Sequence, residues 1–411
     1  MLSLLPAFLV LVLIGTPVAF AVGAVAVGYI LLSGQVPLAI VPTVMFSGMD
    51  SFPLLAIPFF IMAGDLASRC GVLPLLVSFA KVLTGPVRGG LAHVNVASSM
   101  MFGGVTGVAV ADTAAIGGTL IPAMIRDGYS PAFAGAITAA SSVMGAIIPP
   151  SVAMLIIAYI YGGGLSVTKL FLYGATPGLL IGFGMMGYVA LIARRRGFAA
   201  SDEPRTLRNL VRHFLPAFPG LGLPVVVLGG IIGGIFTPTE AGAVAVAYSL
   251  ALGMLLYRNV GLRDVGQSLL FSAKTSAVVF VLLGTAKLIA WLLVINLVPQ
   301  SIGAWLQSII TSKEGFLLMI VLVFIVLGSI MEGVATMIIL VPIVAPMGLL
   351  FEVDGHHLAL IIVMTVQIAL VTPPMAVGLF LVCPLAGCTV KDVSIAVLPF
   401  ILVILGVILL V

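Results

Sequence analysis

An aspartate stands in the middle of one of the most apolar parts of this 411-residue chain. It is Asp112, in the segment VNVASSMMFGGVTGVAVADTAAIGGTLIPAM at 94–124, which also holds the hydroxyl groups of Ser98, Ser99, Thr106 and Thr113 and the glycines Gly103, Gly104 and Gly107. Carboxylate and hydroxyl oxygens bind hard cations, and glycines let a backbone turn tightly beside a ligand. An acid at membrane depth usually marks an ion pathway or a charged partner. The alternative is a packed hairpin whose small residues only let helices approach each other.

Two pairs of adjacent prolines interrupt other apolar segments. They are Pro149-Pro150, within 138–156, and Pro373-Pro374, within 366–380 and directly after Thr372. Proline lacks an amide donor and breaks a helix. We therefore expect the carbonyl groups of Gly145, Ala146 and Ile147 to lack helical partners and to suit a cation of the sodium type. A simple kink would need only one proline, so the paired breaks favour a binding role.

A second polar segment mirrors the first. LGSIMEGVATMIILVPIVAPM, at 327–347, carries Gly328, Ser329, Glu332, Gly333 and Thr336. Glu332 has three interpretations: an acid that couples an ion, a charge that interacts with a helix dipole, or a structural partner. The residues around it do not decide among them.

Other charged residues have simpler interpretations. The run from Thr237 to Glu240 predicts a capping box with proline at the first helical position. Asp65 and Arg69 are four residues apart and predict an ion pair. Lys287 lies in the middle of an expected span, where it is either a counter-ion or a long side chain that reaches toward the membrane surface.

The composition indicates the environment in which these residues act. Of the residues, 62% are hydrophobic and only 7% are charged, whereas soluble proteins carry about 25% charged residues. A soluble enzyme, a disordered regulator and a nucleic-acid binder are therefore excluded, and the net charge of +4 comes from basic residues in short loops. HExxH, GxSxG and Walker motifs are absent from the sequence, so we expect a membrane protein that is not an enzyme and needs no cofactor. Three cysteines, with neither metal-ligand spacing nor an even count, are interpreted as packing residues: Cys70, Cys383 and Cys388.

Apolar segments long enough to cross a bilayer, which takes about 20 residues, predict an all-α polytopic protein. They are 4–32, 52–68, 131–161, 169–193, 213–233, 236–257, 272–297, 356–383 and 391–411. The first is either one helix kinked at Pro17 or two shorter helices. The chain start resembles a signal peptide, but it lacks a basic region and a cleavage motif and is taken as membrane helix.

The segments 89–124 and 316–349 are apolar but interrupted near their middles, which predicts two re-entrant helical hairpins. Basic residues mark cytoplasmic loops, and the densest basic cluster runs from Arg194 to Arg212. Counting spans from that loop places the mouth of the first hairpin inside and the mouth of the second outside.

Matching landmarks indicate an internal duplication. Thr16-Pro17 recurs as Thr237-Pro238, Asp112 with Pro122 as Glu332 with Pro342, Pro149-Pro150 as Pro373-Pro374, and Lys169 as Lys391, at offsets of 220 to 224 residues. We therefore predict two inverted repeats. Residues 1–205 would hold scaffold helices, the hairpin 89–124 and a broken helix at 131–161. Residues 206–411 would hold scaffold helices, the hairpin 316–349 and a broken helix at 356–383. Inverted repeats with broken helices are typical of secondary transporters.

At these motifs the sequence resembles the large membrane subunit of the tripartite ATP-independent periplasmic (TRAP) transporters, over essentially the whole chain. The resemblance rests on PFFIMAGDLASRCG (58–71), GGLAHVNVASSMMFGGVTGVAVADTAAIGGTLIPAM (89–124), the GY of IRDGYSPAFAGAITAASS (125–142), GAIIPPSVAM (145–154) and ALVTPPMAVGLFLV (369–382). It implies sodium-driven uptake of an organic acid anion, such as a dicarboxylate, keto acid or sugar acid, across a bacterial inner membrane. Hairpins and broken helices would form a transport domain that moves like an elevator against a scaffold. The implied partners are a small four-span membrane subunit and a periplasmic substrate-binding protein.

The resemblance also implies where the ligands bind. One sodium site would lie between the first hairpin tip and the first break, at Ser99, Gly103, Thr106, Gly145 and Pro149. A second would lie at Gly328, Gly333, Thr372 and Pro374. Candidate substrate contacts are Ser98, Thr106, Gly107, Asp112, Ser151, Ser329 and Glu332. Relatives commonly have serine directly after the glycine of the first tip, and this chain has Val108 there.

Two other functions remain open at this point. One is a stand-alone sodium- or proton-coupled carrier of dicarboxylates or citrate with a related fold. The other is a channel or a passive scaffold. Uptake by the chain without partners would favour the first, and single-channel currents would favour the second.

Overall fold

The computed structural model describes residues 4–34, 36–84, 87–162, 164–196, 198 and 206–411, and no strand occurs among them. Its α-helices are α1 (Leu4–Leu13), α2 (Val18–Ser33), α3 (Ile40–Met49), α4 (Ala56–Arg69), α5 (Val72–Thr84), α6 (Gly90–Thr106), α7 (Ala109–Arg126), α8 (Pro131–Ser142), α9 (Val152–Ile160), α10 (Val167–Arg196), α11 (Leu207–Ile232), α12 (Pro238–Leu250), α13 (Leu262–Ile295), α14 (Val298–Ile309), α15 (Lys313–Ile330), α16 (Gly333–Leu350), α17 (Gly355–Ala369), α18 (Val377–Ala386) and α19 (Val390–Leu410). Shorter segments are the 3-10 helices η1 (Phe52–Leu55) and η2 (Val143–Ala146) and the π-helix η3 (Ala251–Leu256). Residues 199–205, which include Arg205 and the expected boundary between the halves, lie outside the described residues.

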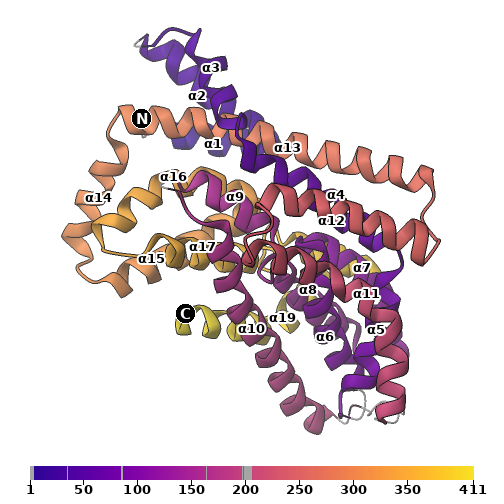
Figure 1. The fold of residues 1–411 in the computed structure, drawn as a ribbon. Helices are drawn as coiled ribbons and strands as arrows, with labels where there is room; N and C mark the ends of the chain where they lie inside the picture. Colours follow the sequence, from indigo (N-terminus) through magenta and orange to yellow (C-terminus); the bar gives the residue numbers. More distant parts are fainter. Residues whose placement is uncertain (1–3, 35, 85–86, 163, 197, 199–205) are drawn as a thin grey trace.

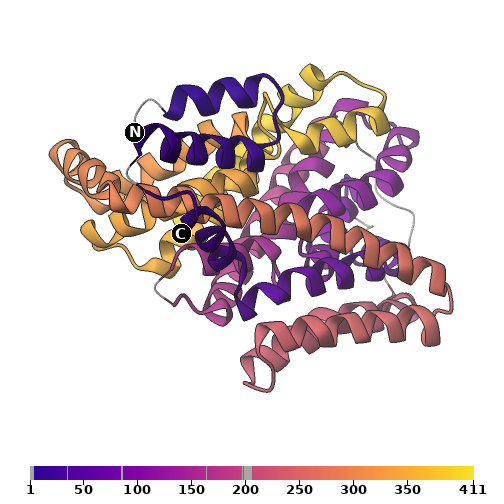
Figure 2. The same ribbon diagram turned by 90° about the horizontal axis from the view of Figure 1, so that it is seen from above.

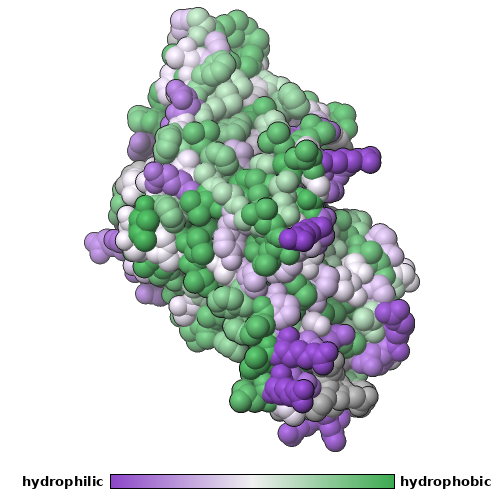
Figure 3. All heavy atoms as spheres, turned by 45° about the vertical axis from the view of Figure 1, so that its right-hand side comes forward, coloured by the Kyte–Doolittle hydropathy of each residue, from purple (hydrophilic) through white to green (hydrophobic). Residues whose placement is uncertain are grey.

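Eight helical segments of the described chain are long and apolar enough to cross a membrane. Figure 3 shows a face that is mostly hydrophobic, with hydrophilic residues gathered mainly toward one end. The prediction of an all-α polytopic membrane protein is therefore confirmed.

Of the two alternatives for the segment 4–32, the structure has the two shorter helices, because Gly15 adopts a φ of +91° and Pro17, which has no amide donor, precedes the first residue of α2. The helices α3, α5 and α14 were missed, since each has only 10 to 13 residues and falls below the length expected of a span.

Helical hairpins occupy the two segments in which re-entrant hairpins were predicted, and the re-entrant path itself stays a prediction. In the first, α6 ends at Gly107, whose φ is +65°, and extended Val108 precedes α7. In the second, Met331 and Glu332 are extended between α15 and α16. The two helices of each hairpin pack against each other.

Both double prolines interrupt a helix. In the first half, α8 continues into η2 and the chain then breaks before α9 begins at Val152. In the second half, α17 ends at Ala369 and α18 begins at Val377. The bond between the two prolines is cis in both places.

The helices of the two halves interlock around these breaks. α18, which follows the second break, packs against α7 and α8 of the first half, and α9, which follows the first break, packs against α16 and α17 of the second. Beside them, α13 contacts α2, α3 and α4. Figure 1 shows α13 along one side of the molecule, and Figure 2 shows it crossing from one side to the other.

The order of elements also recurs along the chain. The series from α6 to α10 consists of a hairpin, a broken helix and a long helix, and the series from α15 to α19 repeats it about 220 residues later. Corresponding helices differ in length: α19 has 21 residues where α10 has 30. The recurrence supports the duplication inferred from the sequence landmarks.

Candidate functional site

Each hairpin turn is hydrogen-bonded to the chain just after the prolines of its own half. The amide of Val152 donates to the carbonyl of Gly107 at 3.2 Å, and the amide of Met375 donates to the carbonyl of Ser329 at 2.8 Å. A turn and a helix break both leave backbone groups without helical partners, and these bonds satisfy some of them. The structure thus places each tip beside the break of its own half.

Glycines allow the first tip and the first break to touch through their backbones. A Cβ atom on Gly103 would lie 2.6 Å from the Cα atom of Gly145, and one on Gly107 would lie 2.5 Å from the carbonyl oxygen of Pro150. Pro149 also approaches the tip, because its carbonyl oxygen would lie 3.4 Å from a Cβ atom on Gly104. Of the residues predicted for the first sodium site, Gly103, Gly145 and Pro149 are therefore brought together through the backbone.

The second tip is held in a similar way, but mostly through side chains. A Cβ atom on Gly328 would lie 2.8 Å from the Cβ atom of Ala369, and one on Gly333 would lie 2.8 Å from a methyl group of Val366. Ser329 is buried, and its hydroxyl group donates to the carbonyl of Val326 at 2.8 Å. Ser329 and Glu332 therefore belong to the second tip, and no hydrogen bond among the described residues joins them to the first site.

Asp112 is the most unusual group in the first site. Its side chain has 0% exposure, and neither carboxylate oxygen has a hydrogen-bond partner among the described residues. It lies in the first turn of α7, close to the hydroxyl groups of Ser99 and Ser142 and to the Cα atom of Gly145. A buried carboxylate without a partner is costly, so this position calls for a cation or a proton.

A buried polar network continues from Asp112 between α6 and α8. Ser99 and Ser141 share a hydrogen bond of 2.9 Å between their hydroxyl groups, and the Ser141 hydroxyl donates to the Oδ1 atom of Asn95 at 3.0 Å. The Nδ2 atom of Asn95 donates to the hydroxyl of Thr138 at 2.7 Å. Of these residues, only Ser99 was predicted to be a ligand. The missed signal is the spacing of three and four residues between polar positions in both helices, which places them on one face.

The remaining residues predicted for the first site differ in how their hydroxyl groups are engaged. Ser98 has a buried hydroxyl with no partner among the described residues. Thr106 is buried and donates to the carbonyl of Phe102 at 3.4 Å, within its own helix. Ser151 caps α9 by accepting from the amide of Met154 at 3.2 Å, and it donates to the carbonyl of Ala146 at 2.5 Å. Ser151 therefore has a structural role at the break in addition to any ligand contact.

The expectation of freed carbonyl groups at the first break was only partly right. Pro149 and Pro150 cannot donate to the carbonyls of Gly145 and Ala146, which stand four residues before them. Ala146 regains a partner in Ser151. No hydrogen bond to the carbonyl of Gly145 occurs among the described residues, and a Cβ atom on Gly145 would lie 3.3 Å from the Cβ atom of Asp112.

At the second break both corresponding carbonyls have partners. Ala369 accepts from the amide of Thr372 at 3.2 Å, and Leu370 accepts from the amide of Gly378 at 2.9 Å. Thr372 is half-buried and donates its hydroxyl to the carbonyl of Ile368 at 2.9 Å, which leaves oxygen lone pairs for a cation. Gln367, which the sequence analysis missed, has a buried Oε1 atom without a partner among the described residues.

Glu332 acts as a helix cap. Its Oε2 atom accepts from the amide of Ala335 at 2.9 Å at the start of α16, and its side chain is exposed. Of the three interpretations left open by the sequence, the structure matches the charge at a helix start. Its counterpart Asp112 has no such bond.

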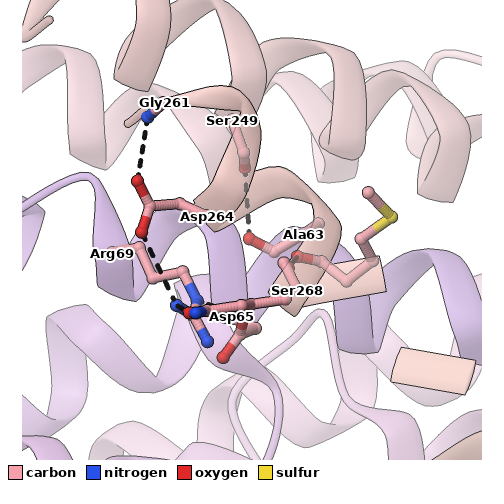
Figure 4. A network of polar contacts seen from close by, with 9 residues as sticks. Ala63, Asp65, Arg69, Ser249, Gly261, Asp264 and Ser268 are labelled. Atoms are coloured by element: carbon pink, nitrogen blue, oxygen red, sulfur yellow. Dashed lines mark hydrogen bonds and ion pairs between the residues drawn. The ribbon is translucent and has the colours of Figure 1, made fainter. Parts of the chain in front are cut away.

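A separate polar cluster joins α4 to the start of α13 (Figure 4). The predicted pair is present, with 2.7 Å between the Nε atom of Arg69 and the Oδ2 atom of Asp65. Arg69 also donates to Gln267 at 2.9 Å and lies 4.0 Å from Asp264. This cluster joins α4 to α13. The same helix α4 also meets the first hairpin tip, because a Cβ atom on Gly64 would lie 2.8 Å from the carbonyl oxygen of Thr106. The capping box at Thr237 and Glu240 is present as well.

Comparison with known proteins gives a consistent family assignment. Residues 5–411 match the family model described as "Tripartite ATP-independent periplasmic transporter, DctM component". The chain is 36% identical over 402 residues to the isethionate TRAP transporter permease protein DctMQ of Oleidesulfovibrio alaskensis, covering 98% of this chain and 63% of that one. It is 36% identical to the C4-dicarboxylate TRAP transporter large permease protein DctM of Pseudomonas aeruginosa (88% and 84% covered). It is 32% identical to the sialic acid TRAP transporter large permease protein SiaM of Vibrio cholerae (94% and 90% covered).

A solved structure supports the fold. The YdaH transporter of Alcanivorax borkumensis matches with a TM-score of 0.65 over 91% of this chain and 87% of that chain, at 17% identity. At this identity the match speaks for the arrangement of helices and not for a substrate.

Proposed function

Because the chain belongs to the DctM component family of TRAP transporters, we propose that it catalyses sodium-coupled uptake of an organic acid anion. The chain is a multi-pass permease subunit of the bacterial inner membrane, and it is not an enzyme. The proposal has three parts: sodium as the coupling ion, an organic acid anion as the substrate, and an elevator motion of the hairpins.

The substrate class is supported by the names of the relatives. They refer to isethionate, C4-dicarboxylates and sialic acid, all of which are organic acids that are anions at neutral pH. The first helix after each hairpin turn, α7 or α16, points its N-terminus toward the break of its own half. Helix N-termini favour negative charge. The start of α16 already holds the carboxylate of Glu332, so the start of α7 is the position that suits a carboxylate or a sulfonate of the solute.

One observation carries the sodium part: the fully buried carboxylate of Asp112 has no partner among the described residues. The hydroxyl groups of Ser99 and Ser142 lie close to this carboxylate. The backbone of Gly145, whose carbonyl accepts no hydrogen bond from the described residues, approaches the Cβ atom of Asp112. Oxygen ligands of this kind suit a hard cation such as sodium, and a bound cation would neutralise the acid. At the second break Thr372 and Gln367 offer neutral oxygens for a second sodium ion.

An inverted repeat and an elevator motion complete the proposal. The recurring order of helices and the way α9 and α18 each pack against the hairpin of the other half support the repeat. The contacts of α13 with α2, α3 and α4 suit a scaffold against which the hairpins move.

The proposed partners follow from the family. The word "tripartite" in the family description points to two further components, and this chain covers only 63% of the DctMQ relative. We propose that the two components are a small four-span membrane subunit and a periplasmic substrate-binding protein. A stand-alone carrier is not favoured, because these relatives are TRAP transporter permeases.

The test is uptake by the complete complex in liposomes, with labelled succinate as the probe, and with isethionate and sialic acid as alternatives. We expect accumulation when sodium is present outside and loss of accumulation when potassium replaces it. Equal uptake in potassium would refute sodium coupling. Uptake by this chain alone, without either partner, would refute the tripartite arrangement.

A further inference from the structure

A cavity of about 790 Å³ lies apart from both proline breaks. Its walls come from the end of α9, the second half of α13, the middle of α16 and the start of α17, which lie close together in Figure 1. A volume of this size is sufficient for a small organic ligand. The orientation inferred from the basic loops places this cavity on the outer side of the membrane.

One charge stands out on these walls. Among the described residues that line the cavity, Lys287 is the only lysine or arginine, and most of the others are aliphatic or aromatic. No acidic side chain of the described chain forms an ion pair with it. Lys287 is exposed, and a single cation between apolar walls has little competition for an anion.

The acid at the cavity edge is already engaged. The Oδ1 atom of Asp354 accepts from the amides of His356 and His357, each at 3.0 Å, and caps α17. The Nε2 atom of His356 accepts from the amide of Ser166 at 3.1 Å, so that nitrogen is not a second cationic donor. Lys287 therefore remains available in the cavity.

Close packing between α3 and α13 fixes the position of Lys287. A Cβ atom on Gly48 of α3 would lie 2.6 Å from the Cβ atom of Lys287, so the absence of a side chain at Gly48 makes room for the lysine. The hydroxyl of Tyr159, from α9, donates to the carbonyl of Gly48 at 2.9 Å and ties the opposite wall to the same point. Tyr161, also in the lining, has a hydroxyl without a partner among the described residues.

We propose that Lys287 and the cavity around it form an outer vestibule, in which the ammonium group binds an acidic group of the transported solute before it reaches the Asp112 site. This inference rests on the proposed function, since it takes the solute to be an organic acid anion. An anionic lipid headgroup shares the same chemistry and is the competing occupant.

The first test measures uptake by the complete complex with Lys287→Met, Lys287→Arg and Lys274→Met. Lys274 is the matched control, because it is an exposed lysine of the same helix that does not line the cavity. We expect Lys287→Met to raise the KM for the acid about tenfold with Vmax within about twofold, and Lys287→Arg to restore most of the affinity. Equal KM values for Lys287→Met and Lys274→Met would overturn the proposal.

The same assay in two lipid compositions separates the two occupants. In liposomes of phosphatidylcholine alone and in liposomes that also contain phosphatidylglycerol, the effect of Lys287→Met should be the same. An effect that appears only with phosphatidylglycerol would assign Lys287 to a lipid phosphate and overturn the vestibule.

A labelling experiment tests the cavity without any transport. Ala290→Cys, one turn after Lys287 and also in the lining, is placed in a background with Cys70, Cys383 and Cys388 replaced by alanine. Two thiosulfonate reagents are applied from outside, one that carries an anionic sulfonate and one that carries a cationic ammonium group. The anionic reagent should label the cysteine faster, and Lys287→Met should lower the ratio of the anionic to the cationic labelling rate about tenfold. An unchanged ratio, or labelling only from inside, would overturn the vestibule. If wild-type uptake fails while the ratio behaves as expected, the proposed function is wrong and the anion site stands.

Discussion

The first proline break is buried and the second is exposed. Pro149 and Pro150 are buried against the first hairpin tip, whereas Pro373, Pro374 and Met375 are exposed. The two breaks nevertheless share the double proline and the hydrogen bond from the following chain to the hairpin turn. The backbone arrangement is thus common to both halves, and the difference lies in the side chains and their surroundings.

The two breaks also differ in the charged groups beside them. Asp112 in the first half is a buried acid without a partner, while Glu332, its counterpart, is exposed and caps α16. The carbonyl of Gly145 is open, whereas those of Ala369 and Leu370 are satisfied by backbone amides. On the proposed function, the first site would bind a cation tightly through a carboxylate, and the second would bind it weakly through neutral oxygens.

The largest effect is expected from Asp112→Asn. The substitution keeps the shape and removes the negative charge, so the first site should lose about a hundredfold in sodium affinity. The sodium dependence of uptake by the complex measures this. Asp65→Asn is the control, because that carboxylate already has a partner in Arg69. If Asp112→Asn kept normal sodium affinity, the carboxylate would not be the cation ligand, and the contrast between the halves would lose its basis.

The next effect concerns stability. Gly103→Ala would place a methyl group 2.6 Å from the backbone of Gly145, and it should cost about 3 kcal/mol. Gly118→Ala, on the first hairpin but with nothing within 4 Å, should cost little. Gly328→Ala should be intermediate, because it meets only the methyl group of Ala369. Thermal unfolding in detergent measures all three. Equal losses for Gly103→Ala and Gly118→Ala would contradict the close packing of the first tip.

The hairpin turns and broken helices could be predicted from the sequence, whereas the hydrogen-bond partners at the breaks could not. Glycine and proline act on the local backbone, so the hairpin turns and the broken helices could be placed from residue types and spacing. The hydrogen-bond donors to the carbonyls of Ala146 and Leu370 could not be predicted from residue types. The hydroxyl of Ser151 and the amide of Gly378 reach these carbonyls only because of the way the chain folds after each break. The bond between Asn95 and Ser141 likewise joins two helices that are 46 residues apart at those positions.

Substitutions of Glu332 test whether this residue and Asp112 have different roles. Glu332→Ala should remove a helix cap and cost about 1 kcal/mol of stability, whereas Glu332→Gln should retain most of the cap. Sodium affinity should change by less than about twofold in Glu332→Gln, since this side chain is engaged at the start of α16. A loss of sodium affinity as large as that of Asp112→Asn would make Glu332 a coupling acid and the two halves equivalent.

At Thr372 we expect a smaller loss of sodium affinity than at Asp112. Thr372→Val keeps the shape and removes the hydroxyl oxygen, and a weak site of neutral oxygens should lose about three- to tenfold in sodium affinity. Thr119→Val is the matched control, because Thr119 makes the same bond to a carbonyl four residues earlier but lies in α7, away from both breaks. Sodium titrations of uptake compare the two variants. Equal affinities would remove Thr372 from the second site, and coupling would then rest on the buried first break alone.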